Sequence, residues 1–193
     1  MTNKIIGALL VFLCTLELVL ILTSWFMSAI EVEGIRSLLS AEGVRWFLGS
    51  FVDGLQNEEL IWGLLLSIAW GCVKNSGVYQ HHHDIRHDGA FRIVLFIDVL
   101  YILFILYLSI PSHAILRSAT GELWPSAFSR AIVPMLAFIL SLSCVIYGLI
   151  TKKFTSVASV VEAMGDGVKT IAPYMVLYVF AMQLINSFRY VIS

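Results

Sequence analysis

Four histidines and two aspartates crowd into one polar stretch, SGVYQHHHDIRHDGAF, of a chain that is otherwise largely apolar. If this stretch is helical, His83 and His87 stand four residues apart on one face, with Asp84 and Asp88 beside them. Two imidazoles and a carboxylate suit Zn²⁺ or another divalent transition metal. The alternative is a solvated connector between membrane helices, because Gly89 follows closely and nothing evident fixes the ligands. The candidate metal ligands are His81, His82, His83, Asp84, His87 and Asp88.

Several other polar side chains fall inside apolar stretches, where a charged group is costly. Glu17 is predicted near the middle of the first membrane span, either as a proton or ion site or as a protonated acid bonded to a neighbouring helix or partner. Asp98 is predicted nearer the cytoplasmic surface, where it can reach water or a cation. Gln183 and Asn186, with Arg189 one turn further, form a polar stripe that either joins helices or contacts a partner.

The composition indicates a membrane protein. The chain has 193 residues, of which 59% are hydrophobic and 13% charged, with a mean hydropathy of +0.89 and a formal net charge of −1. A soluble domain is about half apolar and about a quarter charged. The near-zero net charge and the scattered basic residues argue against nucleic-acid binding.

The predicted fold is all-α: a polytopic membrane protein that forms a single membrane domain over residues 1–193. An apolar run of about 18 residues or more can cross the hydrocarbon layer as a helix. Five segments qualify, and the second is the shortest. The first has no small-residue cleavage site, so we expect it to remain as an anchor. The predicted spans are residues 5–27, 58–76, 91–111, 131–150 and 171–191.

Two connecting stretches place apolar residues at helical spacing and polar residues elsewhere around the helix. We expect amphipathic helices on the membrane surface, in contact with lipid, at residues 34–55 and 154–169. All five lysines fall on one side of the membrane if the amino terminus is cytoplasmic. This arrangement predicts a cytoplasmic amino terminus and an external carboxyl terminus.

Small residues recur at intervals of four along two of the predicted spans. Such faces let helix backbones approach closely, and their usual role is packing within a bundle or across a dimer interface. The residues concerned are Gly63, Ser67 and Gly71 on the second span, and Ala137 with Ser141 and Cys144 with Gly148 on the fourth.

The predicted spans are unbroken. Pro111, Pro134 and Pro173 sit near predicted span ends, where proline is tolerated without breaking a helix. Transport sites at the bilayer midplane need discontinuous helices, whose free amides and carbonyls hold ions and substrate. No catalytic triad order, zinc-protease motif, phosphate-binding glycine loop or dinucleotide fingerprint is present. We therefore predict that the chain is not an enzyme and does not transport on its own.

Two long stretches carry a series of motifs in order. The first is LTSWFMSAIEVEGIRSLLSAEGVRWFLGSFVDGL, with a Ser-Leu-Leu-Ser-Ala-Glu-Gly-Val-Arg-Trp run after the first span. The second is TGELWPSAFSRAIVPMLAFILSLSCVIYGLITKKFTSVASVVEAMGDGVKTIAPYMVLYVFAMQLINSF, in which a span ends in Tyr-Gly and the next begins with Ala-Pro-Tyr-Met-Val-Leu. Together they resemble the p-aminobenzoyl-glutamate transporter (AbgT) family over more than half of the chain.

The resemblance implies a part of an elevator-type transporter. Such transporters have two inverted repeats, each with scaffold helices and a transport module built from a re-entrant hairpin and broken helices. The first module is expected after KNSGVYQ, where HHHDIRHDGAF instead leads into a span that resembles a scaffold helix. The second module is expected after the fifth span, beyond Ser193. We therefore expect this chain to resemble only the scaffold and dimerisation helices of the family.

Three functional hypotheses follow. The first is an interaction subunit of the bacterial inner membrane: a scaffold without transport activity of its own, in a homodimer or in a hetero-oligomer with another membrane protein. The second is a component of a split or degenerate p-aminobenzoyl-glutamate-type secondary transporter, whose hairpins come from another polypeptide. The third is a metal-dependent membrane enzyme or sensor that uses the histidine cluster. No cofactor is predicted apart from a divalent metal in that third case.

Overall fold

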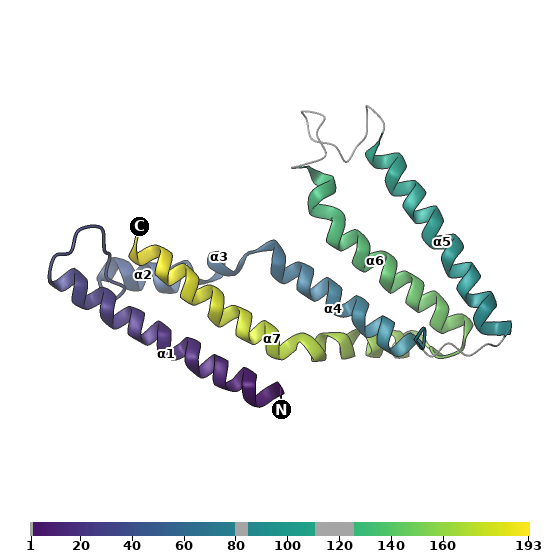
Figure 1. Cartoon of the computed structure of the whole chain (residues 1–193), viewed down its shortest axis with the longest axis horizontal. Coiled ribbons are helices and arrows are strands. Elements are labelled where there is room, and N and C mark those ends of the chain that lie inside the picture. Colours follow the sequence, from purple (N-terminus) through teal and green to yellow (C-terminus); the bar gives the residue numbers. More distant parts are fainter. Residues whose placement is uncertain (1, 80–84, 111–125) are drawn as a thin grey trace. The chain divides into compact units, whose positions relative to one another are not determined.

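The described part of the chain is mainly α-helical. The computed structural model describes residues 2–79, 85–110 and 126–193, and these contain seven helices and no strand (Figure 1). The all-α prediction is confirmed. In chain order the helices are α1 (Thr2–Ala29), α2 (Ala41–Gly49), α3 (Phe51–Leu55), α4 (Glu58–Ser76), α5 (Ile85–Ser109), α6 (Ala127–Ile150) and α7 (Val157–Val191).

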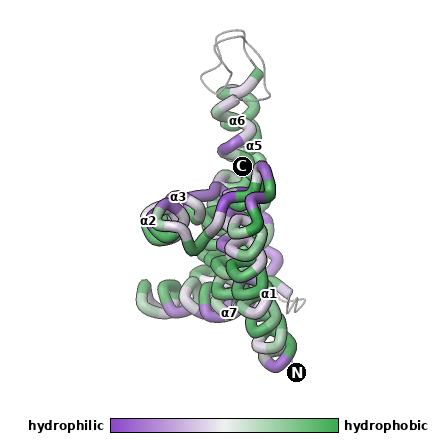
Figure 2. Tube along the Cα trace, turned by 90° about the vertical axis from the view of Figure 1, so that its left-hand side faces the viewer, coloured by the Kyte–Doolittle hydropathy of each residue, from purple (hydrophilic) through white to green (hydrophobic). Residues whose placement is uncertain are grey.

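Four of the described helices, α1, α5, α6 and α7, are long and apolar enough to cross a membrane. Apolar residues predominate along them, as Figure 2 shows for α1. Large apolar side chains such as Leu22, Phe96 and Phe138 are more than half exposed. Exposure of this kind is expected where lipid rather than water surrounds a helix. The chain is a multi-pass membrane protein.

The second predicted span forms α4, which has the predicted bounds but is not one of those four helices. Its apolar stretch extends from Leu60 to Val73, with Glu58 and Glu59 before it and Lys74 after it. At about 1.5 Å per residue this stretch covers about 21 Å, which is less than the hydrocarbon layer of about 30 Å. Among the described residues, four helices thus qualify as spans by length and composition, and the second predicted span corresponds to the shorter apolar helix α4.

The first predicted surface helix, residues 34–55, is a loop followed by the short helices α2 and α3. α2 begins after Ser40, whose side chain accepts a hydrogen bond from the backbone N of Gly43 at 3.0 Å and so caps the helix. The backbone before Ser40 forms a hydrogen bond outside the helix, because the N of Leu38 donates to the Oγ of Ser24 in α1 at 3.2 Å. Because these groups have partners outside a helix, the helix starts later than its apolar pattern predicts.

A single helix, α7, contains both the second predicted surface helix (154–169) and the last predicted span (171–191). It begins at Val157, because Phe154 bends back and is buried with its backbone N donating to the carbonyl of residue 148. Pro173 lies inside α7, where it removes one helical hydrogen bond without ending the helix. The two predicted elements are therefore one continuous helix.

The contacts divide the chain into two compact units. The single membrane domain over residues 1–193 stays a prediction. The first unit contains residues 1–60 and 172–193, so it includes α1, α2, α3 and the later part of α7. Trp46 stacks on Tyr190 in its core, with ring centroids 4.4 Å apart. The remaining residues of this core are Leu20, Ile21, Ile35, Leu38, Phe47 and Val191.

The second unit contains residues 61–171. In this unit α5 and α6 lie side by side and run in opposite directions (Figure 1). α4 crosses the first part of α7, and the small residues Ser67 and Gly71 meet Ala163 and Gly167 at the crossing. A Cβ atom added to either glycine would overlap with backbone atoms of the opposite helix, so the two backbones are in direct contact.

Candidate functional site

The half-buried side chain of Glu17 in α1 places its carboxyl group against α7 in the first unit. Ser187 of α7 is fully buried, and its Oγ donates a hydrogen bond to the Oε1 of Glu17 at 2.6 Å. Gln183, one turn earlier on α7, directs its Nε2 toward the Ser187 Oγ at 3.5 Å. Within the described parts of the chain, the Oε2 of Glu17 is buried and has no hydrogen-bond partner. An acid with one unpartnered oxygen inside a membrane span is a candidate for proton or ion binding, or for contact with another subunit.

The polar stripe predicted on the last span divides between two environments. Gln183 joins the Glu17 cluster, whereas the Nδ2 of Asn186 donates to the backbone carbonyl of Gly54 at 3.0 Å. Arg189 is exposed. Sequence reasoning missed Ser187, although a serine four residues after Gln183 lies on the same helix face.

A second acid is held in the same way in the second unit. The Oγ of Ser143 in α6 donates to the Oδ1 of Asp98 in α5 at 2.5 Å. Both residues line an apolar cavity of about 370 Å³ between α5 and α6. Tyr101 also lines this cavity, and its hydroxyl donates to the carbonyl of Met135 at 3.3 Å. A mostly apolar cavity with a few convergent polar groups is typical of ligand sites and of helix–helix contacts.

The helix that carries Asp98 begins earlier than the predicted span, and the depth of this residue in the membrane stays a prediction. α5 begins at Ile85 and not at residue 91, because the helix extends through the polar residues that precede the apolar run. Asp98 therefore lies near the middle of α5. Both membrane-embedded acids, Asp98 and Glu17, are thus central in their helices, and each accepts a hydrogen bond from a serine on the adjacent helix.

Replacing Ser143 by alanine is expected to destabilise the α5–α6 pair by about 1–3 kcal/mol, because Asp98 would lose its donor in an apolar setting. The matched control is Ser141→Ala on the same helix, since the Ser141 hydroxyl donates only to the Ala137 carbonyl of its own helix. Melting temperatures measured in one detergent compare the two variants. Equal shifts for both would show that the Asp98 hydrogen bond contributes nothing.

Of the predicted small-residue faces, the one on α4 lies at a helix contact within the chain. Ser67 and Gly71 pack on α7, and Gly63 lies near Ile171. On α6, Ala137 and Cys144 are buried, and Gly148 contacts the ring of Phe154. Ser141 is half-buried. The partner face on α7, Ala163 and Gly167, has the same spacing of four and was visible in the sequence.

The histidine cluster is only partly covered by the structure. His81, His82, His83 and Asp84 lie outside the described residues. The Nδ1 of His87 lies 2.9 Å from the Tyr147 hydroxyl of α6, and Asp88 is exposed. Among the residues that are described, no group of three or more potential metal ligands comes together. Metal binding stays a prediction, which the metal content of the purified protein would test.

Comparisons with known proteins agree with the helical architecture. The model of the AbgT putative transporter family matches residues 74–191, which is more than half of the chain and includes all of the second stretch quoted above. The crystal structure of the YdaH transporter from Alcanivorax borkumensis aligns with a TM-score of 0.79 and 14% sequence identity, covering 94% of this chain and 70% of that one. At this identity the likeness concerns the fold. No curated protein sequence matches the chain.

Proposed function

Because the chain belongs to the AbgT transporter family, we propose that it serves as the scaffold of such a transporter, as a subunit of a larger membrane assembly without transport activity of its own. In this proposal, residues 1–193 supply scaffold helices.

The observation that supports this proposal is the continuity of the long helices. α1, α5, α6 and α7 are each a single helix, and α6 and α7 continue through Pro134 and Pro173. The sequence analysis placed both prolines near span ends, whereas the structure places them inside their helices. Each proline removes only one backbone hydrogen bond. Within the described ranges, no span is unwound at mid-depth and no hairpin enters and leaves on one side. A cargo site near the midplane would need such freed backbone groups.

The scaffold proposal predicts assembly. Purified in mild detergent, the protein should elute with a protein mass at least twice that of one chain, because a frame subunit has partners. Light scattering coupled to size exclusion measures this mass, and mass spectrometry of the same fraction identifies its components. A fraction containing only this chain supports a homodimeric frame, and one containing a second multi-pass membrane polypeptide supports the split transporter. A monomer without any partner would contradict both.

The orientation in the membrane is also a proposal. The cytoplasmic amino terminus rests on the lysines, which all fall on one side of the membrane when α4 is counted as a fifth crossing. The bacterial inner membrane is proposed from the family resemblance. A reporter enzyme that is active only in the periplasm, fused after Ser193, should be active. An inactive reporter would contradict the proposed orientation.

A further inference from the structure

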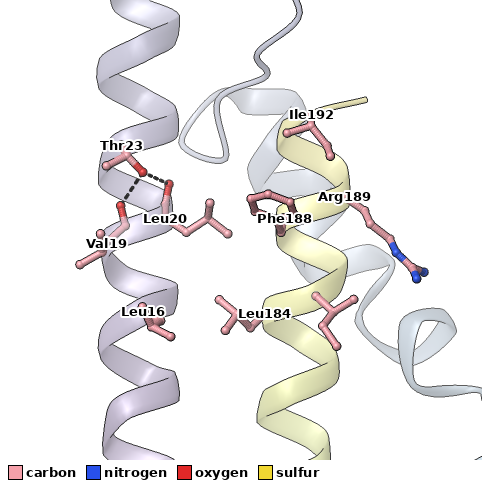
Figure 3. A pocket seen from close by; sticks show the side chains of 9 residues that line it. Leu16, Val19, Leu20, Thr23, Leu184, Phe188, Arg189 and Ile192 are labelled. Atoms are coloured by element: carbon pink, nitrogen blue, oxygen red, sulfur yellow. Dashed lines mark hydrogen bonds between the residues drawn. The ribbon is translucent and has the colours of Figure 1, made fainter.

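An apolar groove runs along the first unit between α1 and α7. It measures about 650 Å³. Figure 3 shows Leu16 level with Leu184, Leu20 level with Phe188, and Thr23 level with Ile192, so the two helices run in the same direction along it. The Thr23 hydroxyl offers no free hydrogen-bond donor to the groove, because it donates to carbonyls of its own helix at 2.7 and 3.1 Å. The groove therefore offers a continuous apolar surface from mid-helix to the end of α7.

A second hollow, of about 500 Å³, is lined in part by charged residues, and Arg189 lines both this hollow and the groove. In Figure 3 the Arg189 guanidinium points away from α1, so its stem borders the groove and its charge lies on the other side of α7. The hollow is also lined by Arg36, Glu42 and Asp53, and thus by two cationic and two acidic side chains. Aromatic residues, Trp46 and Tyr190, form another part of its wall.

Among the described residues, the four charged side chains around the hollow form no ion pairs with one another. These side chains are Arg36, Arg189, Glu42 and Asp53, and all four line the same space. The Arg36 guanidinium lies 6.0 Å from the centre of the Tyr190 ring. Stacked tryptophan and tyrosine side chains suit the headgroup level of a bilayer. The arrangement matches a ligand that carries both charges and has an apolar tail.

We propose that this site binds a phospholipid with a zwitterionic headgroup that contains a phosphate and a primary ammonium. Its phosphate contacts Arg36 and Arg189, its ammonium contacts Glu42 and Asp53, and one acyl chain occupies the groove between α1 and α7. Arginine is well suited to phosphate because its planar donors match the phosphate oxygens. A primary ammonium donates hydrogen bonds to carboxylates, which a quaternary ammonium cannot do. The proposal is independent of the scaffold function.

Charge complementarity selects this occupant over related ones. An anionic lipid without an ammonium would satisfy the arginines but leave Glu42 and Asp53 facing additional negative charge. Free phosphate would satisfy the arginines and leave the groove unused. The shared position of Arg189 connects the two parts, because only an amphiphile can occupy both at once.

The test is lipid retention by the whole protein, measured by native mass spectrometry after exchange into detergent containing equal amounts of phosphatidylethanolamine, phosphatidylcholine and phosphatidylglycerol. We expect phosphatidylethanolamine to be retained preferentially and millimolar inorganic phosphate not to displace it. Equal retention of the three lipids would overturn the proposal. Displacement by inorganic phosphate would do so too, because it would identify a phosphate site without a lipid tail.

Two sets of variants locate the site. Arg189→Gln should weaken retention of phosphatidylethanolamine by about tenfold or more, whereas Arg45→Gln, which lines neither hollow, should leave it unchanged. The double variant Glu42→Gln with Asp53→Asn keeps both arginines and should shift the preference toward phosphatidylglycerol. Unchanged retention in Arg189→Gln, or an unchanged preference in the double variant, would place the lipid elsewhere. Size exclusion confirms that each variant is folded before lipids are compared.

Discussion

Replacing Gly167 by leucine is expected to prevent α4 and α7 from packing and to leave little folded protein. A Cβ atom at this position would overlap with the backbone carbonyl of Ser67 and the backbone of Gly71. Backbone atoms in a helix cannot move aside as a flexible side chain can, so the two helices must separate. Overpacking of a tight contact costs about 1–3 kcal/mol or more, and a leucine against backbone belongs at the upper end. The yield of monodisperse protein and its melting temperature measure the effect.

The matched control is Gly165→Leu, two residues away on the same helix. A Cβ atom at Gly165 meets nothing within 4 Å, so the added side chain finds open space. Because glycine inside a helix is unfavourable by about 0.5–1 kcal/mol relative to alanine, this variant should be at least as stable as the parent protein. If both leucine variants lose stability equally, the close approach of α4 and α7 does not hold the second unit together.

Removing the hydroxyl of Ser187 is expected to destabilise the first unit by about 1–3 kcal/mol, because Glu17 would lose its hydrogen-bond donor. The destabilisation should largely disappear when Glu17 is also replaced, in the double variant Glu17→Leu with Ser187→Ala. Two apolar side chains in place of a buried polar pair are often neutral or stabilising, because nothing is left unsatisfied.

A double-mutant cycle isolates this interaction. Melting temperatures of the parent, the two single variants and the double variant are compared in one detergent. Thr15→Ala serves as a control on α1, since the Thr15 hydroxyl donates only to the Phe12 carbonyl of its own helix. If the double variant is as unstable as Ser187→Ala alone, the carboxyl of Glu17 is not held by this serine.

The helices were largely predictable from the sequence because apolar runs and helical spacing are local signals. The bounds of α4 match the prediction, although its short apolar stretch removes it from the helices that qualify as spans. The join inside α7 was not predictable in this way. The change from an amphipathic to an apolar pattern near residue 170 suggested two elements, but no residue there ends a helix. Pro173 interrupts one hydrogen bond and the helix continues.

The candidate sites show where sequence reasoning stops. Glu17 and Asp98 were identifiable singly, because an acid in an apolar run is unusual. Their serine partners, Ser187 and Ser143, come from other helices, and only the packing of the chain brings each pair together. The approach of Gln183 to this cluster likewise depends on how α1 and α7 face each other.

Uptake by the isolated chain tests the scaffold account most directly. Purified protein reconstituted into liposomes would be given labelled p-aminobenzoyl-glutamate under an inward sodium gradient and, separately, an inward proton gradient. A full-length member of the family, reconstituted in parallel, must show uptake for the assay to be valid. The account predicts that liposomes with this chain accumulate no more label than protein-free liposomes. Saturable uptake above that level by this chain alone would contradict it.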